Sequence, residues 1–196
     1  LWRKRYFEAQ VGMERYLVET YGGDEIERWL PVKAEILAGL ENLESPFSAT
    51  ALWKERFFKT QARLEKYVVQ HHGLEDLGKW ALAIAQIFKY TEPNLGGGAG
   101  DIARRLAKQA HCYRSDYSIT HAGLEYARVE LRHCAIWDYR EVSRSRGVQL
   151  TLKSPCEYCT KATAANARAK GYATTYQLHE DALGHGCTWE ISREDA

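Results

Sequence analysis

Cysteine and histidine side chains gather in the last third of the sequence, where their spacing suits metal chemistry. Cys156 and Cys159 form a C-x-x-C pair at the end of a predicted strand, and His179 and Cys187 lie on a predicted final hairpin. Zinc accepts four such nitrogen and sulfur ligands in tetrahedral geometry. The spacing therefore predicts a zinc site formed by Cys156, Cys159, His179 and Cys187, with His185 as the substitute for His179.

The same cysteines fit two other interpretations, which the sequence leaves open. A free cysteine packs in a core as a small hydrophobic residue. A thiol of lowered pKa acts instead as a nucleophile or a redox centre. The count of five cysteines is odd, and the first ten residues lack the apolar core of a secretory signal, so a disulfide scaffold is not expected.

Cys134 and His121 are the candidate catalytic residues. Cys134 ends an earlier predicted strand, and its thiolate would attack a polarised carbon, while His121 would supply a base. A zinc-bound water, its pKa lowered toward ~7, is the alternative nucleophile. Because the sequence has no G-x-S-x-G or H-E-x-x-H motif, neither a serine nucleophile elbow nor a zincin helix is expected.

Aromatic and polar side chains on both halves of the chain are the candidate substrate-binding residues. Ligand sites favour the interface between domains, so a substrate is expected to enter between a helical half and a sheet. For Tyr67 and Trp80 an equally good interpretation is that they pack in a helical core. The candidates are Tyr67, His71, Trp80, Tyr113 and Glu125.

An internal repeat organises the first half. Residues 1–37 and 52–88 align without a gap at an offset of 51, with identical pairs such as Trp2/Trp53, Tyr16/Tyr67 and Trp29/Trp80. Apolar residues recur at helical spacing in each copy, and Gly22 and Gly73 stand where a helix ends. Each copy is therefore predicted to be one helical hairpin, and two copies suit a compact bundle better than a solenoid.

The segment 92–100 is rich in glycine and breaks the helical pattern. It lacks the G-K-[ST] ending of a phosphate-binding loop, so we expect a hinge, with Asp101 as the N-cap of a helix running to about Ser115. Beyond Ser118 the pattern alternates, which predicts strands at 124–134, 148–152, 172–179 and 187–191, with a turn at 184–186 and helices at 137–145 and 160–170.

These elements predict an α+β protein in which an N-terminal helical repeat of two hairpins packs on a small C-terminal antiparallel sheet with helices. The expected division is a duplicated hairpin region at 1–95, a glycine hinge and connecting helix at 96–117, and an α+β domain with the Cys/His cluster at 118–196.

The composition of the chain indicates which classes of partner are expected. The 196 residues carry 27 Lys and Arg against 26 Asp and Glu, so the basic excess typical of a nucleic-acid-binding protein is missing. No apolar run approaches the ~18 residues of a membrane span. A cytoplasmic protein with a small-molecule substrate or ligand is expected, without nucleic acid or membrane, and a homodimer remains open.

The stretch from Val129 to Ile191 resembles two related groups. Cys134, Cys156 and the segment Gly184–Trp189 are similar to the pattern of the L-2-amino-thiazoline-4-carboxylic acid hydrolase family, although Cys159 and Thr160 stand where that family has an Asp. Cys156, His179 and Cys187 are similar to the closing pattern of 4-vinyl reductase domains, which include zinc-binding sensors; their acidic ligand falls on Tyr176 here.

The resemblance implies two functions. The first is a hydrolase that acts on a C–N or C–S bond of a small amino-acid-like or heterocyclic substrate at a Cys/His site, with zinc. The alternative is a small-molecule binding or sensor domain in which zinc is structural. A closed four-ligand site would favour the second, and an open ligand position the first.

Overall fold

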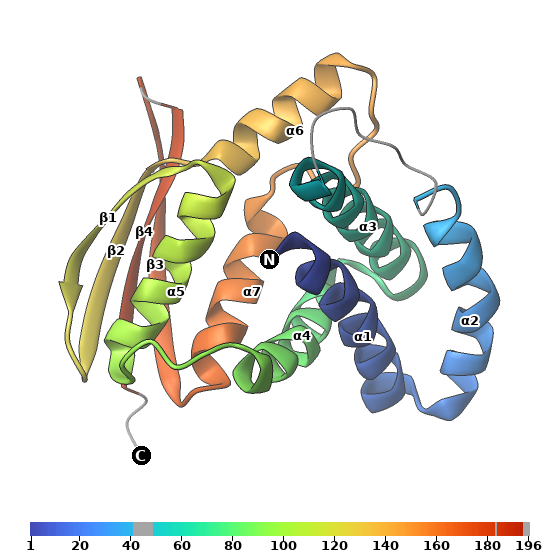
Figure 1. Cartoon of the computed structure of the whole chain (residues 1–196), viewed down its shortest axis with the longest axis horizontal. Coiled ribbons are helices and arrows are strands. Elements are labelled where there is room, and N and C mark those ends of the chain that lie inside the picture. Colours follow the sequence, from blue (N-terminus) through green and yellow to red (C-terminus); the bar gives the residue numbers. More distant parts are fainter. Residues whose placement is uncertain (41–48, 183, 194–196) are drawn as a thin grey trace. The chain divides into compact units, whose positions relative to one another are not determined.

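The computed structural model describes residues 1–40, 49–182 and 184–193 of the chain. These form an α+β protein with seven α-helices and one four-stranded antiparallel sheet in the described part (Figure 1). The chain divides into two compact units, Leu1–Tyr90 and Thr91–Ala196. The finer division expected from the sequence stays a prediction.

The first unit consists of helices. They are α1 (Trp2–Tyr21), α2 (Gly23–Leu37), α3 (Ala49–His72), the short 3-10 helix η1 (Leu74–Asp76) and α4 (Leu77–Thr91). Both α1 and α3 end at a glycine with positive φ, Gly22 at 89° and Gly73 at 95°, a region that L side chains rarely adopt. The buried core consists mainly of large side chains, including Met13, Tyr16, Leu17, Trp29, Leu64, Val68 and Trp80.

The second unit is a sheet with helices on one face. It contains α5 (Gly98–Tyr113), β1 (Asp116–Ala122), β2 (Tyr126–His133), α6 (Ala135–Ser145), α7 (Cys156–Arg168), β3 (Tyr172–Asp181) and β4 (Gly184–Arg193). The strand order is β1-β2-β4-β3, and all neighbours are antiparallel. Helix α5 packs on β1, β2 and β4, and α7 packs on β3.

The core of this unit follows from alternation along the strands. Ala127 and Val129 of β2 and Trp189 and Ile191 of β4 are buried, while Arg128 and Glu190 between them are not. The apolar face meets a helix whose small residues allow close approach. Those residues of α5 are Ala99, Ala103 and Ala110, with Ile102 and Leu106 between them.

Three local predictions are wrong. The segment 148–152 is not a strand; instead the Leu152 carbonyl accepts a hydrogen bond from Arg140 Nη2 at 2.8 Å, which ties it to α6. Helix α5 begins at Gly98, so Asp101 is not its N-cap. Asp101 lies in the first turn and binds Lys170 Nζ at 2.6 Å and Arg105 Nε at 2.8 Å. The residues 184–186, expected in a turn, begin β4.

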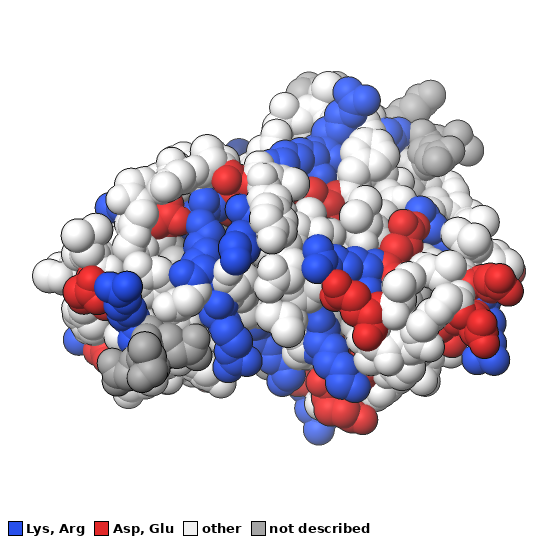
Figure 2. Space-filling model, turned by 90° about the horizontal axis from the view of Figure 1, so that it is seen from below, with Lys and Arg blue, Asp and Glu red and all other residues white. Residues whose placement is uncertain are grey.

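Charged side chains of both signs cover the surface. On the face drawn in Figure 2, blue and red groups both occur, with uncharged surface between them. Several are helical pairs one turn apart, such as Lys4–Glu8, Arg15–Glu19 and Glu55–Lys59. None of the described helices is both long and apolar enough to cross a membrane.

A close approach at Gly12 gives a test of the first unit. A Cβ at this position of α1 would lie 2.4 Å from Cγ1 of Ile84 on α4. We expect Gly12→Ala to lower the free energy of unfolding by about 1–3 kcal/mol because the packed helices must separate. Chemical denaturation measures this. Gly23→Ala is the control, because nothing lies within 4 Å of its Cβ, and an equal loss in both variants would contradict the proposed contact.

Candidate functional site

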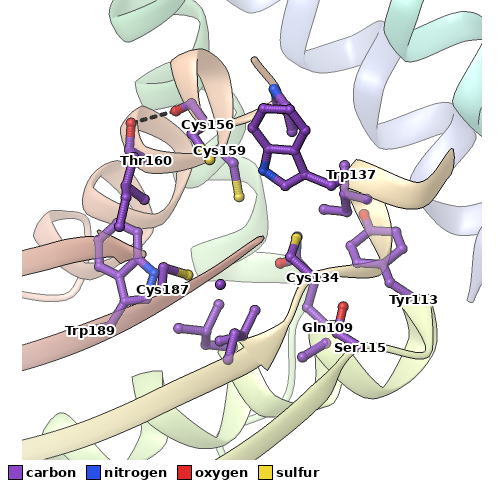
Figure 3. Close-up of a pocket in the computed structure, with 17 residues that line it drawn as sticks. Gln109, Tyr113, Ser115, Cys134, Trp137, Cys156, Cys159, Thr160, Cys187 and Trp189 are labelled. Atoms are coloured by element: carbon purple, nitrogen blue, oxygen red, sulfur yellow. Dashed lines mark hydrogen bonds between the residues drawn. The ribbon is translucent and has the colours of Figure 1, made fainter. Parts of the chain in front are cut away.

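A pocket lies inside the second unit (Figure 3). Its cavity volume is about 30 Å³. The walls come from α5, β2, α6, α7, β3 and β4 and are almost entirely apolar. The lining residues are Leu106, Gln109, Ala110, Tyr113, Ser115, Leu131, Cys134, Ile136, Trp137, Pro155, Cys156, Cys159, Thr160, Leu178, Gly186, Cys187 and Trp189.

Four of the five cysteines line this pocket. Cys134 precedes the first turn of α6, and its backbone N–H donates a hydrogen bond to His185 O at 2.7 Å. Cys156 and Cys159 are three residues apart at the start of α7, so both lie on the same side of the helix. Cys187 is on β4 and shares the inner face of the sheet with Trp189. Figure 3 shows these thiols around one common space.

Burial controls the chemistry of the thiols. Desolvation raises the pKa of Cys134 and Cys159, and it raises the pKa of Cys187 to about 12. The neighbouring cysteines add to each rise, because two thiolates in one apolar space repel one another. At neutral pH these three groups are therefore protonated thiols, and a thiol is a much weaker nucleophile than a thiolate.

The expected zinc site is wrong. No group of three or more His, Cys, Asp or Glu among the residues described is arranged to hold a metal ion. The reason is the alternation of the sheet. Cys187 faces Leu178 across the β3–β4 pair and both line the pocket, so His179, the next residue of β3, points to the opposite face. The substitute, His185, stacks on Trp137 at 3.8 Å between ring centroids.

The structure separates the two candidate catalytic residues. Cys134 lies in the pocket, but His121 is exposed on β1 and pairs with Arg128, six residues before Cys134 along the chain. Six residues of strand span ~20 Å. His121 is therefore not placed to act as a base for Cys134.

Of the two expected substrate-binding residues in this unit, one lines the pocket. Tyr113, at the end of α5, is among the lining residues. Glu125 lies between β1 and β2 and is exposed, with Arg193 Nη1 at 3.3 Å from its Oε1. Tyr113 therefore lines the pocket, and Glu125 does not.

The other three expected substrate-binding residues belong to the first unit. Trp80 is fully buried in the helical core. The ring of Tyr67 is also buried and stacks on His71 at 4.4 Å between centroids. Whether any of them binds a ligand stays a prediction.

A buried carboxylate organises the polar residues of the first unit. Asp76 is 2% exposed. It accepts hydrogen bonds from Tyr16 Oη at 2.6 Å and from Tyr21 Oη, and Lys79 Nζ lies 2.7 Å from its other oxygen. These donors hold the pKa of Asp76 below its usual value although burial by itself would raise it. Asp76 therefore joins α1, η1 and α4 as a charged group.

A second carboxylate of the first unit, that of Glu25, also lies beside basic side chains. His72 Nε2 lies 3.6 Å and Arg28 Nη1 lies 3.4 Å from its oxygens. Burial, together with Glu25, raises the pKa of Tyr67. Burial also lowers the pKa of His72, and the attraction of Glu25 offsets this only in part.

Sequence reasoning missed most of the pocket wall. Neither Trp137 nor Trp189 is among the candidate site residues of the sequence analysis, which names Trp189 only as the end of a motif. Each nevertheless follows a pocket cysteine at the spacing of its element, Trp137 three residues after Cys134 in a helix and Trp189 two after Cys187 in a strand. That spacing, which places each tryptophan on the same face of its element as the cysteine, is the signal from which the two residues could have been found. Ser115 and Thr160 gave no signal in the sequence.

Comparison with known proteins gives no family. No protein-family model matches the chain, and no curated protein matches it. Among solved structures, the Fe(II) unliganded H-NOX protein from K. algicida is similar with a TM-score of 0.49 and 7% identity, over 99% of this chain and 97% of that chain. A point mutant of the same protein gives a TM-score of 0.47 and 6% identity, over 96% of each chain. This similarity is too distant to assign a ligand to this chain.

The expected resemblance to thiazoline hydrolases and 4-vinyl reductase domains is wrong, and with it the expected hydrolase. Neither group is found by the family or curated comparisons, and the two similar structures named above are H-NOX proteins. The raised pKa of Cys134 agrees with this correction, because a hydrolytic thiol nucleophile needs its thiolate.

The raised thiol pKa values predict slow alkylation. We expect Cys134, Cys159 and Cys187 to resist iodoacetamide near neutral pH in the folded protein and to react after unfolding in urea, as followed by peptide mass spectrometry. Because their folded pKa values exceed the reference of 9.0, their contribution to stability is present below pH 9 and is lost as pH rises above it. Rapid native labelling of these three would contradict the assignment.

Histidine burial predicts an opposite pH dependence in the first unit. The folded pKa of His72 lies below the reference of 6.5, so the unfolded chain binds more protons just below that pH. The free energy of unfolding should therefore fall as pH decreases from about 6.5 toward the folded pKa of His72. Urea titrations across this range measure it. His72→Gln should flatten the dependence, whereas the exposed control His111→Gln should leave it unchanged.

Proposed function

We propose that the unit Thr91–Ala196 is a binding module for a small, largely apolar molecule, which occupies the pocket lined by Cys134, Cys156, Cys159 and Cys187. The observation that carries the proposal is a partly open apolar pocket whose four thiols come from the N-cap of α6, from α7 and from β4, all in one unit. This is the binding or sensing interpretation of the sequence, without its zinc.

The polar atoms of the pocket wall support an apolar ligand. Ser115 Oγ accepts the N–H of Ala135 at 3.0 Å, and Thr160 Oγ1 donates to the Cys156 carbonyl at 2.7 Å. These groups already have partners, and a thiol is only a weak hydrogen-bond donor. A strongly polar ligand would lose its water without replacement hydrogen bonds, at a cost of ~2 kcal/mol or more for each group.

The size of the pocket supports a ligand of few heavy atoms. A polar cavity of about 30 Å³ would hold ordered water, but a cavity lined by apolar side chains stays dry and takes up small apolar molecules. Trp137 and Trp189 contribute their indole rings to the wall, and Gln109, exposed on α5, is also among the lining residues. Affinity would then come from contact with rings and sulfur atoms, with little directional bonding.

Protonated thiols favour binding over catalysis. A nucleophilic cysteine requires a nearby base or positive charge to lower its pKa, and burial acts in the opposite direction on Cys134, Cys159 and Cys187. Such thiols are soft, polarisable wall atoms. The proposed role is therefore recognition of the ligand, without bond cleavage.

We also propose that the helices of the first unit are two copies of one hairpin. Contacts between the two copies support this, because residues related by the offset of 51 make equivalent contacts. Trp2 and Phe58 rings are 5.6 Å apart, and their counterparts Trp53 and Phe7 are 6.0 Å apart. Likewise Tyr16 binds Asp76, while the counterparts Tyr67 and Glu25 interact.

Binding of xenon and benzene tests the pocket. Methyl NMR should show saturable shifts for Leu106, Leu131, Ile136 and Leu178, which line it, and none for Leu17 or Leu64 of the helical core. The variant Cys156→Leu fills the space and should weaken binding by about tenfold or more. Cys112→Leu is the matched control, since Cys112 is another half-buried cysteine outside the pocket lining.

A thermal melt of each variant distinguishes a loss of binding from a loss of folding. If Cys156→Leu melts near the wild type and still binds both probes with unchanged affinity, the pocket is not the site. If neither probe shifts any lining methyl of the wild type, the proposed function is wrong.

A further inference from the structure

The two indole rings in the pocket wall differ in the partners of their N–H groups. Trp137 belongs to α6 and Trp189 to β4. The N–H of Trp189 hydrogen-bonds to the sulfur atom of Cys187. The side-chain N–H of Trp137 has no acceptor among the residues that the structure describes. Figure 3 shows its nitrogen on the edge of the ring that faces the sulfur atoms, so the pocket contains an unused hydrogen-bond donor.

Neighbouring groups fix the orientation of this donor. The ring of Trp137 stacks on the imidazole of His185, with 3.8 Å between centroids and 17° between planes. The backbone joins the same two segments, because the N–H of Cys134 donates to His185 O at 2.7 Å. His185 Nδ1 in turn lies 3.6 Å from a carboxylate oxygen of Glu180. A donor whose direction is fixed before binding loses little freedom when an acceptor arrives, which favours affinity.

The sulfur atoms of the wall already accept hydrogen bonds from the protein. Cys134 accepts from the backbone N–H groups of Ile136 and Trp137. Cys159 accepts from the hydroxyl of Thr163. Because these thiols are protonated at neutral pH, each also keeps its S–H as a weak donor. Toward a ligand the wall therefore presents donors, and it suits a molecule that supplies an acceptor.

Charge and hydrogen-bond balance narrow the kind of acceptor. None of the described residues that line the pocket is charged, so a carboxylate or another anion would be buried without a counter-charge. A hydroxyl or an amine would introduce a donor of its own, and thiol sulfur is a weak acceptor for it. A carbonyl oxygen introduces an acceptor and no donor.

We propose that the ligand of this pocket is a small neutral ketone, hydrocarbon apart from one carbonyl oxygen, and that this oxygen accepts the N–H of Trp137. The inference rests on the proposed function and names its ligand class. Trp137 is then the residue that determines specificity, and the rings and thiols of the wall supply the apolar contact.

Cyclopentanone and methylenecyclopentane test the proposal, because they have the same shape and differ in a carbonyl oxygen against a CH2 group. The chain has six tryptophans, and the indole N–H signal of Trp137 is assigned through its own backbone in NMR spectra of the whole 15N-labelled protein. Cyclopentanone should shift this proton signal downfield, because the N–H gains an acceptor. Methylenecyclopentane should bind without a downfield shift.

The variant Trp137→Phe keeps an aromatic ring and removes the N–H. Its affinity for cyclopentanone, divided by its affinity for methylenecyclopentane, should be about fivefold lower than in the wild type. Comparing this ratio between proteins cancels the different costs of removing the two probes from water. The matched control is Trp53→Phe, a half-buried tryptophan of the first unit, which should leave the ratio unchanged.

Thermal melts show whether each variant is folded. An unchanged ratio in a folded Trp137→Phe variant, or bound cyclopentanone that leaves the Trp137 signal in place, would overturn the ketone assignment and leave the pocket a binding site. Binding of the hydrocarbon without the ketone would do the same. If neither probe binds the wild type, the proposed function is wrong as well.

Discussion

Alternation of side chains across the four-stranded sheet determines which residues can meet in the second unit. The β3–β4 register places Leu178 opposite Cys187 and Tyr176 opposite Trp189, all on the face that α5 and α7 cover. The same register sends His179 to the opposite face. A shift of one residue would exchange these sets, so the pocket, its thiols and the loss of the expected metal site all depend on this one pairing.

Burial without ionic partners gives the pocket its chemical character. The thiols of Cys134, Cys159 and Cys187 have raised pKa values because apolar walls exclude water, and none of the described residues supplies a cation that would stabilise a thiolate there. In the first unit the opposite holds for Asp76, which is 2% exposed but has two tyrosines and Lys79 as donors. One chain thus contains a buried site that stays neutral and a buried site that stays charged, and the proposed apolar ligand suits the first.

Short local signals determined much of the fold. Helical spacing of apolar residues, glycines at helix ends and alternation beyond Ser118 predicted an α+β protein with helices first and an antiparallel sheet later. These signals failed where a segment's partner is distant in sequence. Residues 148–152 alternate like a strand, but Arg140 holds the Leu152 carbonyl, and no local pattern announces such a contact.

The sequence by itself determined which side chains are available: the four clustered cysteines, the aromatic load and the offset of 51 between similar segments. It predicted a zinc site at Cys156, Cys159, His179 and Cys187 and, separately, a nucleophile at Cys134; the structure places the four cysteines, without His179, around one pocket. Only the tertiary structure decided what that site is. The direction of a strand side chain, the degree of desolvation of a thiol and the ~20 Å that separate His121 from Cys134 all arise from pairing between distant segments, which spacing along the chain does not encode.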